Sequence, residues 1–466
     1  MRNKLRTMLW VIFLPLAFPA WGQGQQATEI DILRSELAQL RSDYEERIED
    51  LEQRLNAAEL KAEQASLEAS QATLVARESQ AVPAAVPVAA PPPERTGATS
   101  SNAFNPALGV IFQGQAWAYN NNPDDYYIAG FPLGGEAGLA PEGLALAETE
   151  ININANVDDK FTAWLTAPLV LEDGEAGIEI EEAWVETLKL PAGLSLRMGR
   201  FFSNIGYLNP RHAHTWDFAD QPLVYRAFLG SQYLDDGLQL RWMAPTDFYL
   251  ELSSELLRGG RYPAGGAANS GIGSHTLAAH TGGDVGFSNS WLFGLSWLHA
   301  ESDPRESGSE DDPVVFTGDT DLLIADFVWK WAPNGNSRQR NFIFQAEYML
   351  SKQDGDYALS DALPLPWDID QRGWYAQAIY QPWPQWRIGA RIDRLSSDTP
   401  NQVFAGSVLD PMRKHPSRYS LMVDWSNSEF SRLRLQYNYD KSGAENDNQF
   451  ALQYIYSIGA HGAHTF

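Results

Sequence analysis

The pattern that most constrains this chain is an alternation of apolar and polar side chains, clearest between residues 449 and 458. In an extended strand, successive side chains point to opposite faces. One face of this segment is apolar and the other is mostly polar: Phe450, Leu452, Tyr454, Tyr456 and Ile458 against Gln449, Gln453 and Ser457. The last strand is expected to have no later element to cover its apolar face, and the pattern recurs back to about residue 107. We therefore expect lipid to cover that face, as in an all-β transmembrane antiparallel β-barrel of the outer membrane.

Composition agrees with a barrel that has a wet interior. The 466 residues include no cysteine, 16 Trp and 18 Tyr, yet the mean hydropathy is −0.34. Beyond the start of the chain, no apolar run approaches the roughly 20 residues that a membrane-spanning helix needs. The net charge of −26 argues against a nucleic-acid partner.

The amino-terminal region is predicted to direct export. Arg2, Lys4 and Arg6 precede an apolar stretch that ends near Ala20, and small residues follow. This order is typical of a signal peptide, here residues 1–22.

Residues 28–80 are predicted to form a periplasmic coiled coil. Apolar residues recur at alternating spacings of three and four from Ile30 to Ala72, with one stutter near Ile48. A single helix of this kind has no other surface against which to bury its apolar stripe, which favours self-association. The alternative is a solvated helix of marginal stability. A Pro/Ala-rich linker at 81–103 follows, and the barrel would occupy 104–466.

The remainder divides into sixteen predicted strands, an even number that places both barrel ends on the periplasmic side. Their ranges are 107–119, 143–157, 160–171, 177–188, 193–202, 233–244, 246–257, 274–283, 290–301, 320–332, 340–352, 371–382, 385–396, 416–427, 429–440 and 448–459.

The connections between these strands alternate in length, which is typical of outer-membrane barrels with short periplasmic turns and long outer loops. Short turns are expected at 158–159, 189–192, 245, 285–289, 333–339, 384 and 428. Long links are expected at 120–142, 302–319 and 397–415, and the longest at 203–232.

Two motifs carry a resemblance to a known family. The chain enters its longest link through Arg-Met-Gly-Arg-Phe-Phe at 197–202, and the link contains Asn-Pro-Arg-His-Ala-His at 209–214. With the architecture above, the chain resembles the phosphate-selective porin (porin O/P-like) superfamily of Gram-negative outer membranes. The second motif is similar to the related zinc-regulated outer-membrane proteins. The resemblance covers almost the whole chain and implies a homotrimer that passes small solutes.

Porins of this kind fold their third outer loop into the lumen, so the resemblance implies that residues 203–232 narrow the pore. A sixteen-strand barrel is wide enough to need such a constriction. The side chains expected there are Arg211, His212, His214, Asp217 and Asp220.

The lumen charges depart from the phosphate porins, because no ladder of arginines with a lysine cluster is present. The polar faces carry acidic residues in the first half and basic residues in the second: Glu148, Glu150, Glu179, Glu181, Glu251 and Glu255 against Arg387, Arg391, Arg394, Arg432 and Arg434. Arg197 and Arg241 are also assigned to the lumen. Opposed walls would create a transverse field; alternatively, the charges only hydrate the inner face.

His212 and His214 are candidate metal ligands. In extended backbone both imidazoles point the same way, and Asp217 and Asp220 could add oxygen ligands for Zn²⁺, or for nickel or copper. The alternative is a hydrogen-bonded scaffold. No cofactor is expected, apart from zinc as a transported or bound ion.

The sequence predicts a water-filled channel rather than an enzyme, in contact with outer-membrane lipid and with small solutes or ions. An outer-membrane hydrolase remains an alternative, although no Gly-x-Ser-x-Gly motif is present. A structural tether or adhesin built on the coiled coil is another.

Overall fold

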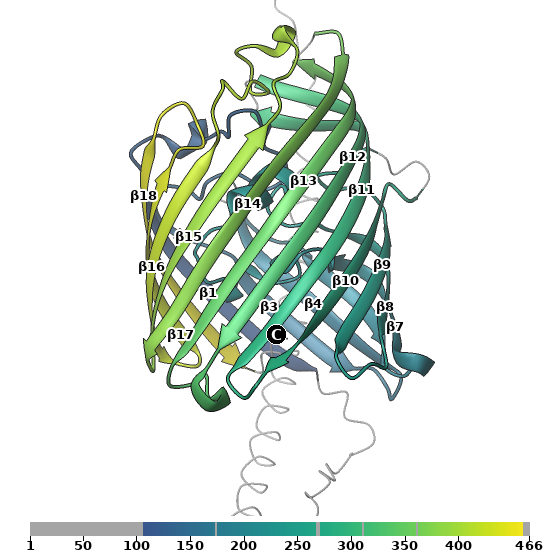
Figure 1. Ribbon diagram of the computed structural model, residues 1–466, viewed down its shortest axis with the longest axis vertical. Helices are drawn as coiled ribbons and strands as arrows, with labels where there is room; N and C mark the ends of the chain where they lie inside the picture. Colours follow the sequence, from purple (N-terminus) through teal and green to yellow (C-terminus); the bar gives the residue numbers. More distant parts are fainter. Residues whose placement is uncertain (1–105, 173–174, 267–270, 310–311, 360–361, 460–466) are drawn as a thin grey trace, which may run out of the picture. The chain divides into compact units, whose positions relative to one another are not determined.

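The computed structural model describes residues 106–172, 175–266, 271–309, 312–359 and 362–459. The signal peptide, coiled coil and linker predicted for residues 1–103 lie outside this part of the chain. Nearly all the described residues form one antiparallel sheet with its inward loops (Figure 1).

The described residues contain eighteen strand segments, one α-helix and five short 3-10 helices. The strands are β1 (Ala107–Ala118), β2 (Gly143–Leu146), β3 (Thr149–Asn156), β4 (Phe161–Glu172), β5 (Glu175–Ile178), β6 (Glu182–Thr187), β7 (Leu194–Phe202), β8 (Leu234–Met243), β9 (Tyr249–Leu257), β10 (Ser274–Val285), β11 (Asn289–Ser309), β12 (Asp312–Trp331), β13 (Asn341–Leu359), β14 (Leu365–Trp383), β15 (Trp386–Ser397), β16 (Ser417–Ser428), β17 (Ser431–Asp440) and β18 (Asp447–Gly459). The helices are η1 (Pro123–Asp125), η2 (Pro191–Gly193), η3 (Ala213–Thr215), α2 (Leu223–Leu229), η4 (Pro333–Gly335) and η5 (Gln402–Phe404).

The sheet closes into a barrel because β1 pairs with β18 on one side and with β2 and β3 on the other. Segments β2 and β3 lie end to end along β1, and β5 and β6 lie end to end along β4. Each of these two pairs is one interrupted strand, so the described residues form a barrel of sixteen strands. The predicted strand number is confirmed.

Each interruption is a β-bulge with one extra residue. Leu146 pairs with Gly114, and Glu150 pairs with Ile111. The chain therefore advances four residues from β2 to β3 while it advances only three along β1. The same difference separates Ile178 from Glu182 opposite β4. An extra residue reverses which side chains point inward beyond it.

The two faces of the sheet differ as expected for a barrel in lipid. On β17 and β18, Leu435 and Phe450 are 59% and 55% exposed, whereas Gln436 and Gln453 are each 4% exposed. Apolar side chains therefore face outward and polar ones inward, which is typical of transmembrane barrels. In the part of the chain that the structure describes, no helix is long and apolar enough to cross a membrane.

The connections fall into two classes at the two ends of the barrel. All the predicted short turns lie at one end, between β3 and β4, β6 and β7, β8 and β9, β10 and β11, β12 and β13, β14 and β15, and β16 and β17. The long link predicted at 302–319 is wrong. Strands β11 to β14 instead continue as long ribbons, 19 to 21 residues each, which run to the upper rim in Figure 1.

Above the other strands, these ribbons carry a separate apolar cluster. Val314, Phe316, Tyr357 and Trp367 on the ribbons pack against Phe404 in the link that follows β15. This contact buries one face of the ribbons above the part of the barrel whose outer face is apolar. It explains why the strands continue where the sequence predicted loops.

Candidate functional site: the lumen and its carboxylate–histidine cluster

The link between β7 and β8 lies inside the barrel rather than outside it. Its helix α2 is buried along its whole length. Leu223, Val224 and Leu229 of this helix are at most 1% exposed and pack against inward side chains of β11 to β15. Each buried aliphatic side chain contributes about 1.5 to 3 kcal/mol. One side of the lumen is therefore filled by an apolar core.

Glu347 on β13 anchors the start of this link. Its carboxylate accepts hydrogen bonds from the backbone N–H groups of Tyr207 and Leu208, both at 3.1 Å, and from the Tyr225 hydroxyl. Gly206 has φ +62, and a Cβ there would lie 2.5 Å from the same carboxylate. Only glycine fits this close approach without displacement.

Asp220 anchors a later part of the link to β15 and β16, two and three strands from β13 in the sheet. Its carboxylate accepts hydrogen bonds from Arg391 on β15 at 2.6 Å and from Arg418 on β16 at 2.8 Å. Gln436 and Asn438 on β17 donate to it as well. Burial would raise the pKa of Asp220, but the neighbouring arginines outweigh this effect and hold that pKa below its usual value.

Two further contacts tie the middle of the link to the same wall. Asp217 accepts a hydrogen bond from Arg387 at 2.7 Å, and Arg387 also binds Asp424. Arg434 donates to the backbone carbonyl of Trp216 at 2.7 Å. The link is thus held from its beginning to its end.

His212 and His214 lie against the acidic wall formed by β3 and β6. Nε2 of His212 lies 3.0 Å from Oε2 of Glu182, and Nδ1 lies 3.2 Å from Oε2 of Glu181. Nδ1 of His214 lies 2.7 Å from Oε1 of Glu150. Glu150, His212 and His214 offer ligand atoms within 4.8 Å of one another, and no other group of this kind is found among the described residues.

The charges around the two imidazoles affect them differently. Burial alone would lower the pKa of His212, but the carboxylates of Glu150, Glu181 and Glu182 hold that pKa well above its usual value. Burial lowers the pKa of His214, and the attraction of Glu150 does not compensate fully. The cluster therefore attracts positive charge most strongly at His212.

The two β-bulges assemble this cluster. In a regular strand, adjacent residues point to opposite faces, so Glu181 and Glu182 could not both approach one side chain. The bulge between β5 and β6 lets both reach His212. The bulge between β2 and β3 turns Glu150 inward, where it is completely buried. Bulges often redirect side chains at functional sites in this way.

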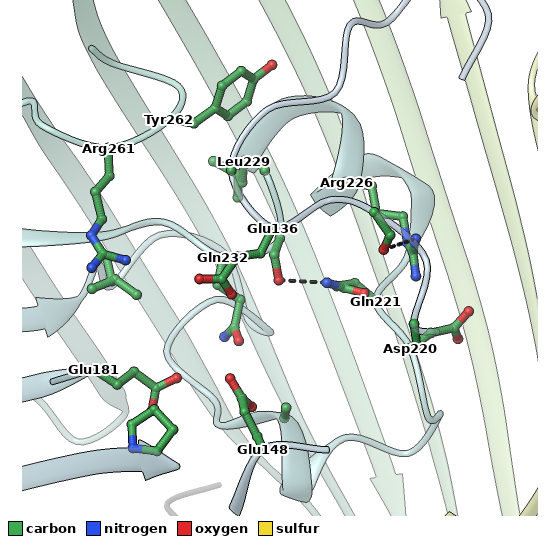
Figure 2. A pocket seen from close by; sticks show the side chains of 18 of the residues that line it. Glu136, Glu148, Glu181, Asp220, Gln221, Arg226, Leu229, Gln232, Arg261 and Tyr262 are labelled. Carbon is green, nitrogen blue, oxygen red and sulfur yellow. Dashed lines mark hydrogen bonds between the residues drawn. The ribbon is translucent and has the colours of Figure 1, made fainter. Parts of the chain in front are cut away.

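Beside this cluster the lumen keeps an open hollow of about 750 Å³. Figure 2 shows Glu136, Glu148 and Glu181 turned toward this space. Its lining holds six acidic and three basic side chains: Glu136, Glu148, Glu179, Glu181, Asp220 and Glu306 against Arg226, Arg261 and Arg305. Two of the arginines donate to backbone carbonyls from buried positions, Arg226 to Ala137 and Arg305 to Pro263. The hollow is therefore predominantly acidic.

Most of the other predicted lumen residues are engaged with neighbours. Arg197 and Arg241 both bind Glu186. Glu251 accepts a hydrogen bond from Asn204 at 2.9 Å. Glu255 binds Ser203, Asn204, Gln239 and Thr276. Arg432 lies 3.4 Å from the Trp216 carbonyl. Arg211 stacks on Tyr207, with its guanidinium 4.0 Å from the ring centre.

Three expectations need correction. Asp217 and Asp220 cannot join His212 and His214 at a metal, because both carboxylates bind arginines on the opposite wall. Arg394 points outward, since β15 buries Arg391, Asp393 and Leu395 on alternate positions. The transverse field expected from the basic residues is reduced, because Arg387 and Arg391 form ion pairs with Asp424 and Asp393.

Several residues of the site were not foreseen. Glu182 is not among the predicted lumen residues, because strict alternation from Glu179 and Glu181 does not place it on their face. Glu347 could have been identified as an inward residue, but nothing in its local sequence indicates that it binds a loop 140 residues away.

Comparisons with known proteins place the chain as follows. No family model matches the sequence. Among solved structures, it is similar to the outer membrane channel DcaP of Acinetobacter baumannii, with 13% identity, 76% of this chain and 97% of that chain covered, and a TM-score of 0.48. It is also similar to an anion-selective porin from Comamonas acidovorans, with 10% identity, 76% and 99% covered, and a TM-score of 0.48.

One curated relative is similar along most of the sequence. The "Uncharacterized protein" of Aquifex aeolicus (strain VF5) is 30% identical over 341 residues, which cover 70% of each chain. The chain belongs to the same protein family as this Aquifex aeolicus protein.

Proposed function

We propose that this protein is an outer-membrane porin, a water-filled channel for the passive uptake of small solutes or ions, in which residues 203–232 form the constriction. The observation that carries the proposal is the position of this segment. It lies within a closed, outwardly apolar barrel and is anchored to Glu347 on β13 and to Arg391 on β15. A polar hollow of about 750 Å³ remains beside it.

The charge of the hollow favours cations. Acidic side chains outnumber basic ones in its lining, even when Asp220 is left out because Arg391 and Arg418 balance its charge. Rings of carboxylates in a pore attract cations and repel anions. The proposal includes the metal-ion preference, with zinc as the example, because His212 and His214 of the constriction segment lie against the acidic wall.

Recording of single channels in planar bilayers tests the function. We expect discrete openings and, under a salt gradient, a reversal potential of the sign that indicates cation preference. Replacing residues 210–221 with a short Gly-Ser link should raise the conductance and weaken the selectivity, because the link no longer narrows the lumen. A native protein that forms no channels would contradict the proposal. An unchanged conductance after shortening would contradict the role of the segment.

We also propose a homotrimer, with the coiled coil predicted at residues 28–80 in the periplasm. The predicted helix carries a narrow apolar stripe among many charged residues, so a single copy in water would be only marginally stable. Deleting residues 28–95 should lower the yield of trimer while the barrel still shows heat-modifiable migration on gels. Native mass measurement of the full chain in mild detergent provides the control, and monomers alone would disprove the trimer.

A further inference from the structure

The carboxylate–histidine cluster has an arrangement that suits a divalent metal ion. Nδ1 of His212 is buried and forms no hydrogen bond with any described residue, and the same is true of Oε2 of Glu181, which lies 3.2 Å away. Oε2 of Glu150 lies 3.5 Å from the same nitrogen. Two carboxylate oxygens thus converge on one buried imidazole nitrogen, an arrangement that needs a cation between them, either a proton on Nδ1 or a metal ion in its place.

Glu182 determines which nitrogen of His212 can bind a cation. It lies 3.0 Å from Nε2, so that nitrogen carries a proton and donates it to the carboxylate. The lone pair of the neutral imidazole is then on Nδ1, the side that faces Glu150 and Glu181. A carboxylate that holds the outer nitrogen of a metal-binding histidine is the usual arrangement around zinc.

The charges at this place favour a dication. A metal ion binds these imidazoles only after they lose their protons. The ionised carboxylates of Glu150, Glu181 and Glu182 then place three negative charges around His212, and one Zn²⁺ balances two of them. Two imidazoles and one or two carboxylates form a ligand set that zinc uses in proteins, with bonds of about 2.0 to 2.2 Å. The ligand atoms of Glu150, His212 and His214 already lie within 4.8 Å of one another, so small side-chain rotations would bring them to a common ion.

The cluster is also placed where occupancy would affect conduction. Glu181 belongs both to the cluster and to the lining of the hollow. His212 and His214 belong to the constriction segment, whereas Glu150 and Glu181 belong to the wall. An ion bound here would fasten the segment to the wall and reduce the negative charge of the hollow.

We propose that Glu150, His212 and His214, with Glu181 as a further ligand, form a binding site for one zinc-like divalent ion, and that its occupancy lowers cation conduction. The effect on conduction rests on the proposed porin function. Binding does not, so the two can be tested separately.

Binding is measured on the full chain in detergent, after treatment with chelator, by competition for Zn²⁺ with a chromophoric chelator. We expect one equivalent to bind, and the affinity to fall at least tenfold in H212A/H214A. Glu150→Gln should give a similar loss with little risk to folding, since the amide can still bond to His214. Glu182→Gln should lower the affinity for zinc by about 10- to 100-fold, because it changes only the group that orients His212.

Conduction is then recorded in planar bilayers with and without Zn²⁺. The native channel should conduct less with zinc and recover with chelator, whereas H212A/H214A should not respond. The matched control is H275A/H299A, which removes the other close histidine pair, at 5.0 Å between ring centres. That pair lies on the outer face of β10 and β11, so this variant should respond as the native channel does.

Two results would overturn the inference: zinc binding no tighter in the native protein than in H212A/H214A, or a native channel whose conductance zinc leaves unchanged. Tight zinc binding by a protein that forms no channels even in chelator would instead refute the porin proposal and leave the metal site in place.

Discussion

Replacing Asp220 with Ala should release the end of the constriction segment from the barrel wall. Asp220 is 5% exposed and accepts hydrogen bonds from four side chains on β15, β16 and β17. Without it, the ion-pair partner left to Arg391 and Arg418 among the described residues would be Asp393, which they would share. Breaking a buried ion pair by removing one partner costs about 3 to 5 kcal/mol. We expect the free energy of unfolding, measured in urea, to fall by this amount. Amide hydrogen exchange around residues 216–224 should also become faster.

Asp217→Ala is the matched control for this prediction. Asp217 lies three residues earlier in the same segment and also binds an arginine, Arg387. Here, however, the arginine keeps two hydrogen bonds to Asp424, and the pair is partly open to the lumen. Asp217→Ala should therefore lower the free energy of unfolding clearly less than Asp220→Ala does. Equal losses in the two variants would show that Asp220 is not the principal anchor.

Replacing Leu452 with Arg should destabilise the barrel through its outer face. Leu452 lies near the middle of β18 and is 41% exposed on the apolar side. A charged side chain on the lipid face near the bilayer midplane costs about 2 to 4 kcal/mol. We expect a matching fall in the free energy of unfolding, measured in lipid vesicles by tryptophan fluorescence against urea.

Gln115→Arg tests the opposite face at the same depth, because Gln115 pairs with Gln453 on β18, next to Leu452. Its side chain lines the acidic hollow, so a positive charge there should be tolerated. Gln436 and Gln453 are less suitable controls, since both are buried and hydrogen-bonded inside the barrel. If Gln115→Arg were as destabilising as Leu452→Arg, the assignment of inner and outer faces would be wrong.

The number and faces of the strands could be predicted because they depend on a local period of two. Each strand exposes one face to lipid and one to the lumen, so neighbouring residues in the sequence are enough to identify it. The upper parts of β11 and β12 were missed, since Ser302 and Asp319 belong to a polar stretch without this alternation. What stabilises those ribbons is contact with Phe404, almost a hundred residues later.

The site was only partly predictable for the same reason. His212 and His214 were identified by their spacing, but their partners depend on two bulges that reverse the inward phase. A bulge adds one residue without a strong sequence signal, which is why Glu182 is missing from the predicted lumen residues. The arginine partners of Asp217 and Asp220 lie about 170 to 200 residues away, beyond any local pattern.

The anchoring of residues 203–232 also has a consequence for how the barrel is assembled. Asp220 receives a hydrogen bond from Asn438, 218 residues later in the chain, and strands β8 to β18 all follow the segment in sequence. Contacts between such distant residues form slowly, because long stretches of chain must be ordered first. Arg391, Arg418 and Arg434 of the later strands gain part of their hydrogen bonds only when the barrel closes around this segment. Faulty versions of this segment should therefore delay insertion and closure of the barrel before any channel exists to be measured.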